Sequence, residues 1–285
     1  GYAPKDGQAF MDFCRSKALS EELLYELGMF KRGEDGNTYA MFRQRIMIPV
    51  RNRWGRIIAY TARYIGDNRK APKYINSATS MIYSKGETVF GIDRAARLRD
   101  ADYYIIVEGA PDVLRMQSIG YDNTVASLGT ALTPVHAALI KRYVNEVYLT
   151  YDSDEAGTKA ALRAGPILRE VGITAKIIRM EPYKDPDEFI KNLGAEAFEE
   201  RIQKARNGFM FSLEILERDY DMTSPEGRTD FMKEAARKLT EFDEEIERNN
   251  YIDAVAGTYH VGSEDLKKLV GRMAVQTGLA KPVER

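Results

Sequence analysis

The sequence predicts an α/β protein in which a mostly parallel sheet, with helices on both faces, lies between a basic α+β subdomain and a C-terminal helical bundle. Strand-like and helix-like segments alternate over 103–180, which is typical of parallel sheets. Upstream, residues 43–99 carry 13 Lys and Arg against 3 Asp and Glu. Downstream of residue 194 the chain is charged and helix-periodic. We therefore expect three domains, at 1–99, 100–206 and 207–285.

The first part of the chain predicts few regular elements. Residues 1–42 look helical apart from a polar turn. Residues 45–50 and 57–63 have the apolar and β-branched composition of strands, and the stretch between them predicts a turn. We expect residues 64–91 to be irregular and basic, and residues 92–99 to be helical. Together these elements predict a small subdomain with a basic face.

The alternating part predicts four strands separated by three helices. The strands are expected at 103–107, 124–128, 146–151 and 175–180. The helices are expected to begin at Pro111, Thr133 and Glu155, and Gly172 follows the last of them, where glycine commonly ends a helix. In the bundle that follows, Ser224 is a predicted helix start.

Carboxylates follow three of the four predicted strands. They are Glu108 and Asp112 after the first, Asp152 and Asp154 after the third, and Asp185 and Asp187 after the fourth. The carboxyl ends of the strands of an open α/β sheet form one crevice, so we expect these side chains to gather there. A single Asp in such a place is more often a helix cap or a turn residue. Three groups, each placed after a strand, favour a shared site.

Such a cluster predicts a divalent metal site. Two carboxylates about 4 Å apart repel by roughly 4 kcal/mol at an effective dielectric constant near 20, and a bound cation turns this repulsion into attraction. Oxygen ligands without a nearby thiolate or imidazole suit Mg²⁺ or Mn²⁺ rather than zinc. We therefore expect one of these ions as the cofactor.

Composition excludes several other classes of protein. The longest apolar run is too short to span a membrane. Cys14 is the single cysteine, which excludes a disulfide framework and a cysteine-based zinc site. The glycine-rich loops of P-loop and dinucleotide-binding proteins are absent. We expect a cytoplasmic protein, without a membrane partner.

The three acidic segments resemble the Toprim domain. Residues 107–114, VEGAPDVL, are similar to its glutamate motif, and residues 152–157, DSDEAG, are similar to its DxD motif. Residues 185–188, DPDE, resemble the segment that follows in primases. Topoisomerases, nucleases and primases share this domain, so it leaves the reaction open.

The basic part narrows the resemblance to bacterial DnaG-type primases. The segments that carry it are 42–50, 55–59, 72–77, 85–86 and 90–91, and residues 125–130 also resemble a family segment inside Toprim. The resemblance implies synthesis of short RNA primers on single-stranded DNA by metal-dependent nucleotidyl transfer. The partners it implies are the DNA template, the RNA primer and ribonucleoside triphosphates.

Residue roles are likewise implied by the resemblance. Glu108, Asp152 and Asp154 would be catalytic and hold two or more metal ions, with Asp112, Asp185 and Asp187 assisting. A second group would contact nucleotide phosphates, primer or template: Arg63, Lys73, Asn76 and Lys85, with Arg43 and Arg45 as weaker candidates on the same face.

The resemblance also sets expectations about partners. The zinc-binding and helicase-binding modules of full-length primases have no expected counterpart in this chain. The replicative helicase and single-strand-binding protein would then bind regions outside it, and the core would be monomeric.

Two other functions stay open at this point. A Toprim nuclease or topoisomerase would use the same carboxylates, although nothing marks one of the 17 tyrosines as a nucleophile. A non-catalytic Toprim module would bind nucleic acid without needing a metal.

Overall fold

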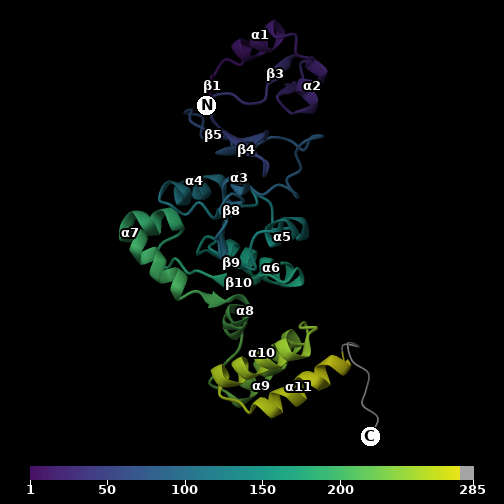
Figure 1. Ribbon diagram of the computed structural model, residues 1–285, viewed down its shortest axis with the longest axis vertical. Helices are drawn as coiled ribbons and strands as arrows, with labels where there is room; N and C mark the ends of the chain where they lie inside the picture. Colours follow the sequence, from purple (N-terminus) through teal and green to yellow (C-terminus); the bar gives the residue numbers. More distant parts are fainter. Residues whose placement is uncertain (277–285) are drawn as a thin grey trace. The chain divides into compact units, whose positions relative to one another are not determined.

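The computed structural model describes residues 1–276 of the chain, which divides into two compact units, Gly1–Arg206 and Asn207–Arg285 (Figure 1). The larger unit contains two principal sheets and the smaller is helical. Within the described residues, no helix is both long and apolar enough to cross a bilayer.

The first sheet is antiparallel and has the strand order β1-β4-β5-β6. Its strands are Tyr2–Ala3, Arg45–Arg51, Ile57–Tyr64 and Tyr74–Asn76. The two central strands were predicted from their composition, and the expected turn lies between them. The expectation of an irregular segment at 64–91 is wrong for β6, which pairs with β5 in the register Arg63↔Tyr74. Three residues that pair with a strand distant in sequence leave no clear local pattern.

The helical expectation for residues 1–42 is only partly correct. Two short helices form, α1 at Gln8–Ser16 and α2 at Glu21–Glu26, but an antiparallel hairpin follows, with β2 at Phe30–Arg32 and β3 at Thr38–Ala40. The Asp35 side chain accepts a hydrogen bond from the Asn37 backbone N–H at 3.1 Å. This turn chemistry favours a hairpin over a helical connection.

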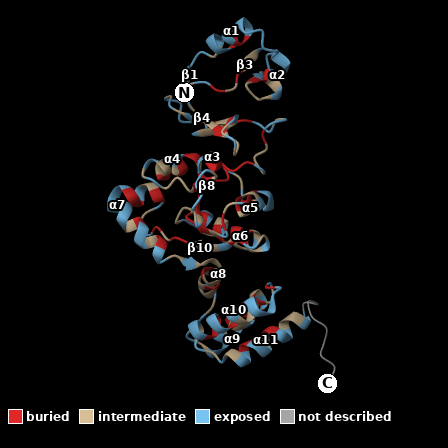
Figure 2. Cartoon of the chain, viewed as in Figure 1, coloured by how far each residue is buried: buried red, intermediate tan, exposed pale blue. Residues whose placement is uncertain are grey.

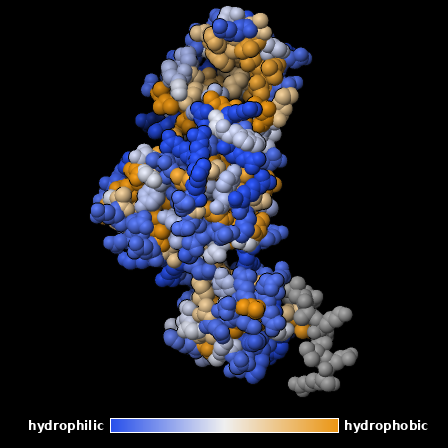
Figure 3. Space-filling model, in the orientation of Figure 1, coloured by the Kyte–Doolittle hydropathy of each residue, from blue (hydrophilic) through white to orange (hydrophobic). Residues whose placement is uncertain are grey.

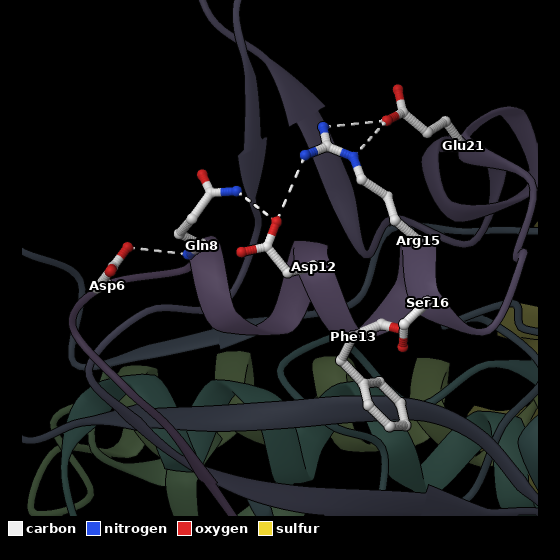
Figure 4. A network of polar contacts seen from close by, with 7 residues as sticks. All are labelled: Asp6, Gln8, Asp12, Phe13, Arg15, Ser16 and Glu21. Carbon is white, nitrogen blue, oxygen red and sulfur yellow. Dashed lines mark hydrogen bonds and ion pairs between the residues drawn. The ribbon is translucent and has the colours of Figure 1, made fainter.

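A polar network links the two short helices. Arg15 of α1 contacts Asp12 one turn earlier and Glu21 at the start of α2, and Asp12 also accepts from Gln8 (Figure 4). These side chains are about half exposed, so each ion pair stabilises the fold by only about 0.2–1 kcal/mol. Beneath them, Met11, Cys14, Leu24 and Phe30 form a small apolar core.

The central sheet has the strand order β11-β10-β9-β7-β8, and the pairs β10–β9, β9–β7 and β7–β8 are parallel. Its strands are Tyr103–Val107 (β7), Thr124–Ala126 (β8), Glu146–Leu149 (β9), Thr174–Ile177 (β10) and Arg206–Asn207 (β11). The four predicted strands are confirmed, although three end earlier than expected. The expectation that strands stop after residue 194 is wrong, because the short β11 adds an edge strand.

Helices cover both faces of the central sheet, as predicted. They are α3 at Ile92–Ala95, α4 at Ala110–Ser118, α5 at Pro134–Lys141, α6 at Glu155–Glu170 and α7 at Pro186–Gln203. Figure 1 shows α4 and α7 on the opposite side of the sheet from α5 and α6. The predicted helix at 92–99 ends early, since Leu98 bonds back only three residues, to the Ala95 carbonyl.

Alternate residues of β7 pack against opposite layers. Ile105 and Val107 belong to a core cluster with residues of α4 and α7, and Tyr104 and Ile106, which point the other way, are also buried. Figure 2 shows this buried layer running through the central sheet. Burial on both faces explains the nearly continuous apolar sequence of the strand.

The described part of the smaller unit is a bundle of four helices: α8 at Gly208–Glu217, α9 at Pro225–Leu239, α10 at Glu245–Tyr259 and α11 at Ser263–Gln276. The predicted start at Ser224 is confirmed, since its side chain accepts from the Gly227 N–H at 3.0 Å. Its core combines aliphatic and aromatic residues, including Phe242, which stacks on Tyr251.

Candidate active site

Two carboxylates meet where the neighbouring strands β7 and β9 end. Glu108 directly follows β7, and Asp152 lies in the loop after β9. The Asp152 backbone N–H donates to Glu108 Oε1 at 3.0 Å. Because β7 and β9 are adjacent parallel strands, their carboxyl ends bring together residues that are 44 positions apart in the sequence.

The next carboxylate is held by the start of α6. Asp154 is the N-cap of this helix, and its Oδ1 accepts from the Gly157 N–H at 2.9 Å. A Cβ on Gly157 would lie 2.0 Å from the Asp152 carbonyl oxygen, so only glycine permits this close approach. The pattern DSDEAG therefore places Asp152 and Asp154 through a tight turn against the helix.

The third acidic segment opens α7. Asp185 is the N-cap and accepts from the Glu188 N–H at 2.8 Å. Asp187 is differently placed, because its carboxylate forms ion pairs with Arg115 of α4, at 2.9 Å from Nε, and with Lys191. Asp187 therefore ties α7 to α4, and its charge is already balanced.

Asp112 lies in the first turn of α4 and accepts from the Gly109 N–H at 3.1 Å. Burial raises the pKa of Asp112 to about 6, and the negative charges of Asp185, Asp152 and Glu108 add to this effect. Burial also raises the pKa of Glu108, with Asp152 and Asp154 as further causes. These five carboxylates therefore act on one another electrostatically.

Lys184 supplies a cation to this cluster, a feature that sequence analysis missed. Its Nζ lies 3.1 Å from Asp152 Oδ2. Its backbone is held on both sides, because the carbonyl accepts from the Ser153 N–H at 2.8 Å and the N–H donates to Glu188 Oε2 at 2.8 Å. The hydrogen bond to Asp152 raises the pKa of Lys184, with the charges of Asp152, Asp154 and Asp185 as further causes. The available signal was a lysine directly preceding the DPDE segment.

The donor set suits a hard divalent cation. All five mutually repelling groups offer carboxylate oxygens, the ligands that Mg²⁺ and Mn²⁺ prefer. Over residues 1–276 no three Asp, Glu, His or Cys side chains already form a closed metal-binding group. Helix caps use one oxygen of Asp154 and one of Asp185, and Lys184 holds one of Asp152. The residues fit such an ion by chemistry and charge. The carboxylates of Asp152, Asp154 and Asp185 would need to reorient for the oxygens in these contacts to face it.

The antiparallel sheet lies next to this cluster. Asn76 of β6 donates from Nδ2 to the Leu128 carbonyl, at 3.3 Å, in the loop after β8. Tyr74, beside Asn76 in the same strand, is influenced by both Arg63 and Asp112: burial raises its pKa, Arg63 opposes this and Asp112 adds to it. Arg63 and Lys73 are exposed at this sheet, and Figure 3 shows hydrophilic side chains gathered over β4 and α3.

The remaining basic candidates differ in accessibility. Lys85 is half-buried, and its carbonyl is bonded to Nε2 of the buried His136 at 2.9 Å. Arg43 is exposed and lies over the Tyr39 ring. Arg45 is only 5% exposed and donates to the Ala62 carbonyl at 3.2 Å. A guanidinium held in this way favours a structural role for Arg45 over contact with a ligand.

Family models match three successive parts of the chain. Residues 1–96 match the N-terminal domain of the DNA primase catalytic core, residues 105–190 match a Toprim-like domain, and residues 209–264 match the DnaB-helicase binding domain of primase. The last match corrects the expectation that the helicase-binding module has no counterpart here. A charged helical bundle carries no local pattern that separates a partner-binding domain from a structural one.

Individual relatives agree with the models. The chain is 33% identical to a DNA primase of Clostridium acetobutylicum over 278 residues. The matched region covers 98% of this chain and 46% of the relative. The chain thus spans about half the length of the curated relatives it matches.

Solved structures show the same similarity. The zinc-binding and RNA polymerase domains of the Aquifex aeolicus primase match with a TM-score of 0.78 and 31% identity, over 93% of this chain and 64% of that one. A DnaG primase catalytic domain bound to single-stranded DNA matches with a TM-score of 0.79 and 29% identity, over 90% of this chain and 84% of that one. The chain therefore belongs to the family of DnaG-type DNA primases, in which it corresponds to the catalytic core.

Proposed function

We propose that this chain synthesises short RNA primers on single-stranded DNA by nucleotidyl transfer that depends on Mg²⁺ or Mn²⁺. The observation that carries the proposal is the gathering of Glu108, Asp152 and Asp154 at the ends of β7 and β9, beside a sheet that exposes Arg63 and Lys73. An acidic centre next to a basic face suits a reaction between phosphate groups.

In this proposal Glu108, Asp152 and Asp154 hold the metal ions, and Asp112 and Asp185 add negative charge around them. Metal ions held by these residues would supply positive charge that lowers the pKa of the primer 3′-hydroxyl and offsets charge on the leaving pyrophosphate. Lys184, whose Nζ lies 3.1 Å from Asp152 Oδ2, would supply a positive charge for a phosphate next to the ions. Because Asp187 is paired with Arg115 and Lys191, its role is to hold α7 against α4.

The basic residues would hold the nucleic acid and the nucleotide. Arg63, Lys73 and Lys85 would supply positive charge for phosphates of template, primer or nucleotide, and Asn76 anchors the antiparallel sheet to the loop after β8. Binding through backbone phosphates is largely independent of base sequence and weakens as salt rises. The likeness to a catalytic domain bound to single-stranded DNA supports this part of the proposal.

Residues 209–264 would contact the replicative helicase, which is supported by their match to a helicase-binding domain. Binding of single-strand-binding protein outside this chain, a monomeric core and a cytoplasmic location stay predictions from the family resemblance.

The test is incorporation of labelled ribonucleotides on a single-stranded DNA template, with Mg²⁺ or Mn²⁺ and with EDTA as control. Short RNA products that disappear in EDTA, and in Glu108→Gln or Asp152→Asn, would support primer synthesis. Asp122→Asn is the matched control, since Asp122 is exposed and pairs only with Arg94 among the ion pairs of the described chain. Degradation of the template without ribonucleotides would indicate a nuclease instead. Absence of metal binding in calorimetry would indicate a non-catalytic module.

A further inference from the structure

A basic hollow of about 380 Å³ opens at the edge of the central sheet where β10 and β11 lie. Its lining comprises one apolar residue, one carboxylate and four cations: Ile177, Glu181, Arg179, Arg201, Lys204 and Arg206. We call it the β10–β11 hollow. None of its residues belongs to the acidic cluster or to the basic sheet.

The cations come from separate segments of the chain. Arg179 lies in the loop after β10, Arg201 and Lys204 lie at the end of α7, and Arg206 lies in β11. Residues 100–285 as a whole carry 24 Lys and Arg against 33 Asp and Glu. Four cations around one hollow therefore form a local basic group in a part of the chain whose net charge is negative.

Contacts hold two of the guanidinium groups in place. Arg201 Nη2 donates to the Glu181 carbonyl at 3.1 Å, and the same guanidinium lies over the Phe189 ring at 5.3 Å from its centre. Arg179 pairs with the Glu181 carboxylate at 3.0 Å. Glu181 is the single acidic side chain in the lining, and Lys204 pairs with Glu200 of α7 at 3.3 Å. The four cations of the hollow therefore outnumber these two carboxylates.

We propose that the β10–β11 hollow binds phosphate groups. Guanidinium groups present paired N–H donors that match phosphate oxygens, and three of the four cations are arginines. The volume of the hollow lies within the range of sites for small ligands. The phosphates belong either to the backbone of a nucleic-acid strand or to a free nucleotide, which offer the same chemical group. The inference goes beyond primer synthesis, because the hollow uses no residue of the proposed active site.

The test compares two double variants that each remove two positive charges. Arg179→Gln/Arg206→Gln alters the hollow, and Lys159→Gln/Arg163→Gln alters exposed positions of α6 in the same unit. A third variant, Lys204→Gln, changes a side chain that is 74% exposed and so leaves folding intact. Fluorescence anisotropy measures binding of a labelled oligothymidylate over a range of salt concentrations, and calorimetry measures binding of ATP. Both are done in EDTA, which separates the result from metal binding at the acidic cluster.

If the hollow binds a nucleic-acid backbone, the hollow variants weaken oligothymidylate binding by about 3–10-fold. They also reduce the logarithmic salt dependence by about 0.7 for each phosphate that the protein no longer neutralises. If the hollow binds a free nucleotide, the same variants lose ATP binding and keep oligothymidylate binding. The α6 variant changes neither. Hollow variants that match the α6 variant in both measurements, with thermal unfolding like that of wild type, would overturn the proposal.

Discussion

Replacing Asp112 by Asn is expected to stabilise the metal-free protein near neutral pH. Burial first, and then the charge of Asp185, raises the pKa of Asp112 from 3.8 to about 6. A raised pKa means that the folded state disfavours the ionised carboxyl. Its ionisation therefore lowers stability progressively as pH rises from about 4 to about 6, and the full cost is present above that range. A shift of about two units corresponds to about 3 kcal/mol, at 1.36 kcal/mol per unit.

The assay is urea unfolding in EDTA, near neutral pH and near pH 4. Asn keeps an acceptor for the Gly109 N–H, which donates to Asp112 at 3.1 Å. We expect Asp112→Asn to be more stable than wild type by about 1–3 kcal/mol near neutral pH and equal to it near pH 4. The control Asp122→Asn removes an exposed partner of Arg94 and should change stability by no more than about 0.5 kcal/mol. An Asp112→Asn variant that gains nothing near neutral pH would refute the idea that the ionised, buried Asp112 carboxyl destabilises the metal-free fold.

Two further substitutions test how the loops of the site are held. Gly157→Ala would place a Cβ 2.0 Å from the Asp152 carbonyl oxygen, so it should destabilise the fold by about 1–3 kcal/mol and reduce primer synthesis. The control is Gly165→Ala, at a helical position where an added Cβ meets no atom within 4 Å, and it should be neutral or stabilising. Equal stability and equal primer synthesis in the two variants would contradict the account. Lys184→Gln removes the cation that is 3.1 Å from Asp152 Oδ2, so Mg²⁺ affinity measured by calorimetry should rise roughly 2–5-fold, whereas Lys159→Gln should leave it unchanged. An unchanged or lower affinity in Lys184→Gln would show that Lys184 does not compete with the metal.

The acidic centre could be predicted because its information is local. Glu108 and Asp152 each follow a strand rich in apolar residues, and parallel strands end at the same edge. The glycine at 157 fits the same pattern, since the turn around Asp152 and Asp154 leaves no room for a side chain. Spacing along the chain was sufficient for this part of the site.

Other features depend on contacts between distant segments and left no such pattern. The hairpin of β2 and β3 forms through pairing and a polar turn, in a stretch whose composition looked helical. Arg45 looked like its basic neighbours, yet pairing of β4 with β5 buries it. Lys184 belongs to the site because it forms an ion pair with Asp152, which is 32 positions earlier and on a different loop. The sequence shows that basic residues are present, whereas their burial in the folded protein determines which of them are accessible to a ligand.

The most direct test of the account is primer synthesis by wild type, Asp152→Asn and Asp122→Asn, compared side by side with and without Mg²⁺. The account predicts metal-dependent RNA products from wild type and Asp122→Asn, and a loss on the order of 100-fold or more in Asp152→Asn. It also predicts a thermal unfolding temperature of Asp152→Asn close to that of wild type, because the change removes both repulsion within the acidic cluster and the ion pair with Lys184. Primer yield from Asp152→Asn equal to that of wild type would contradict the assignment of the active site to the ends of β7 and β9.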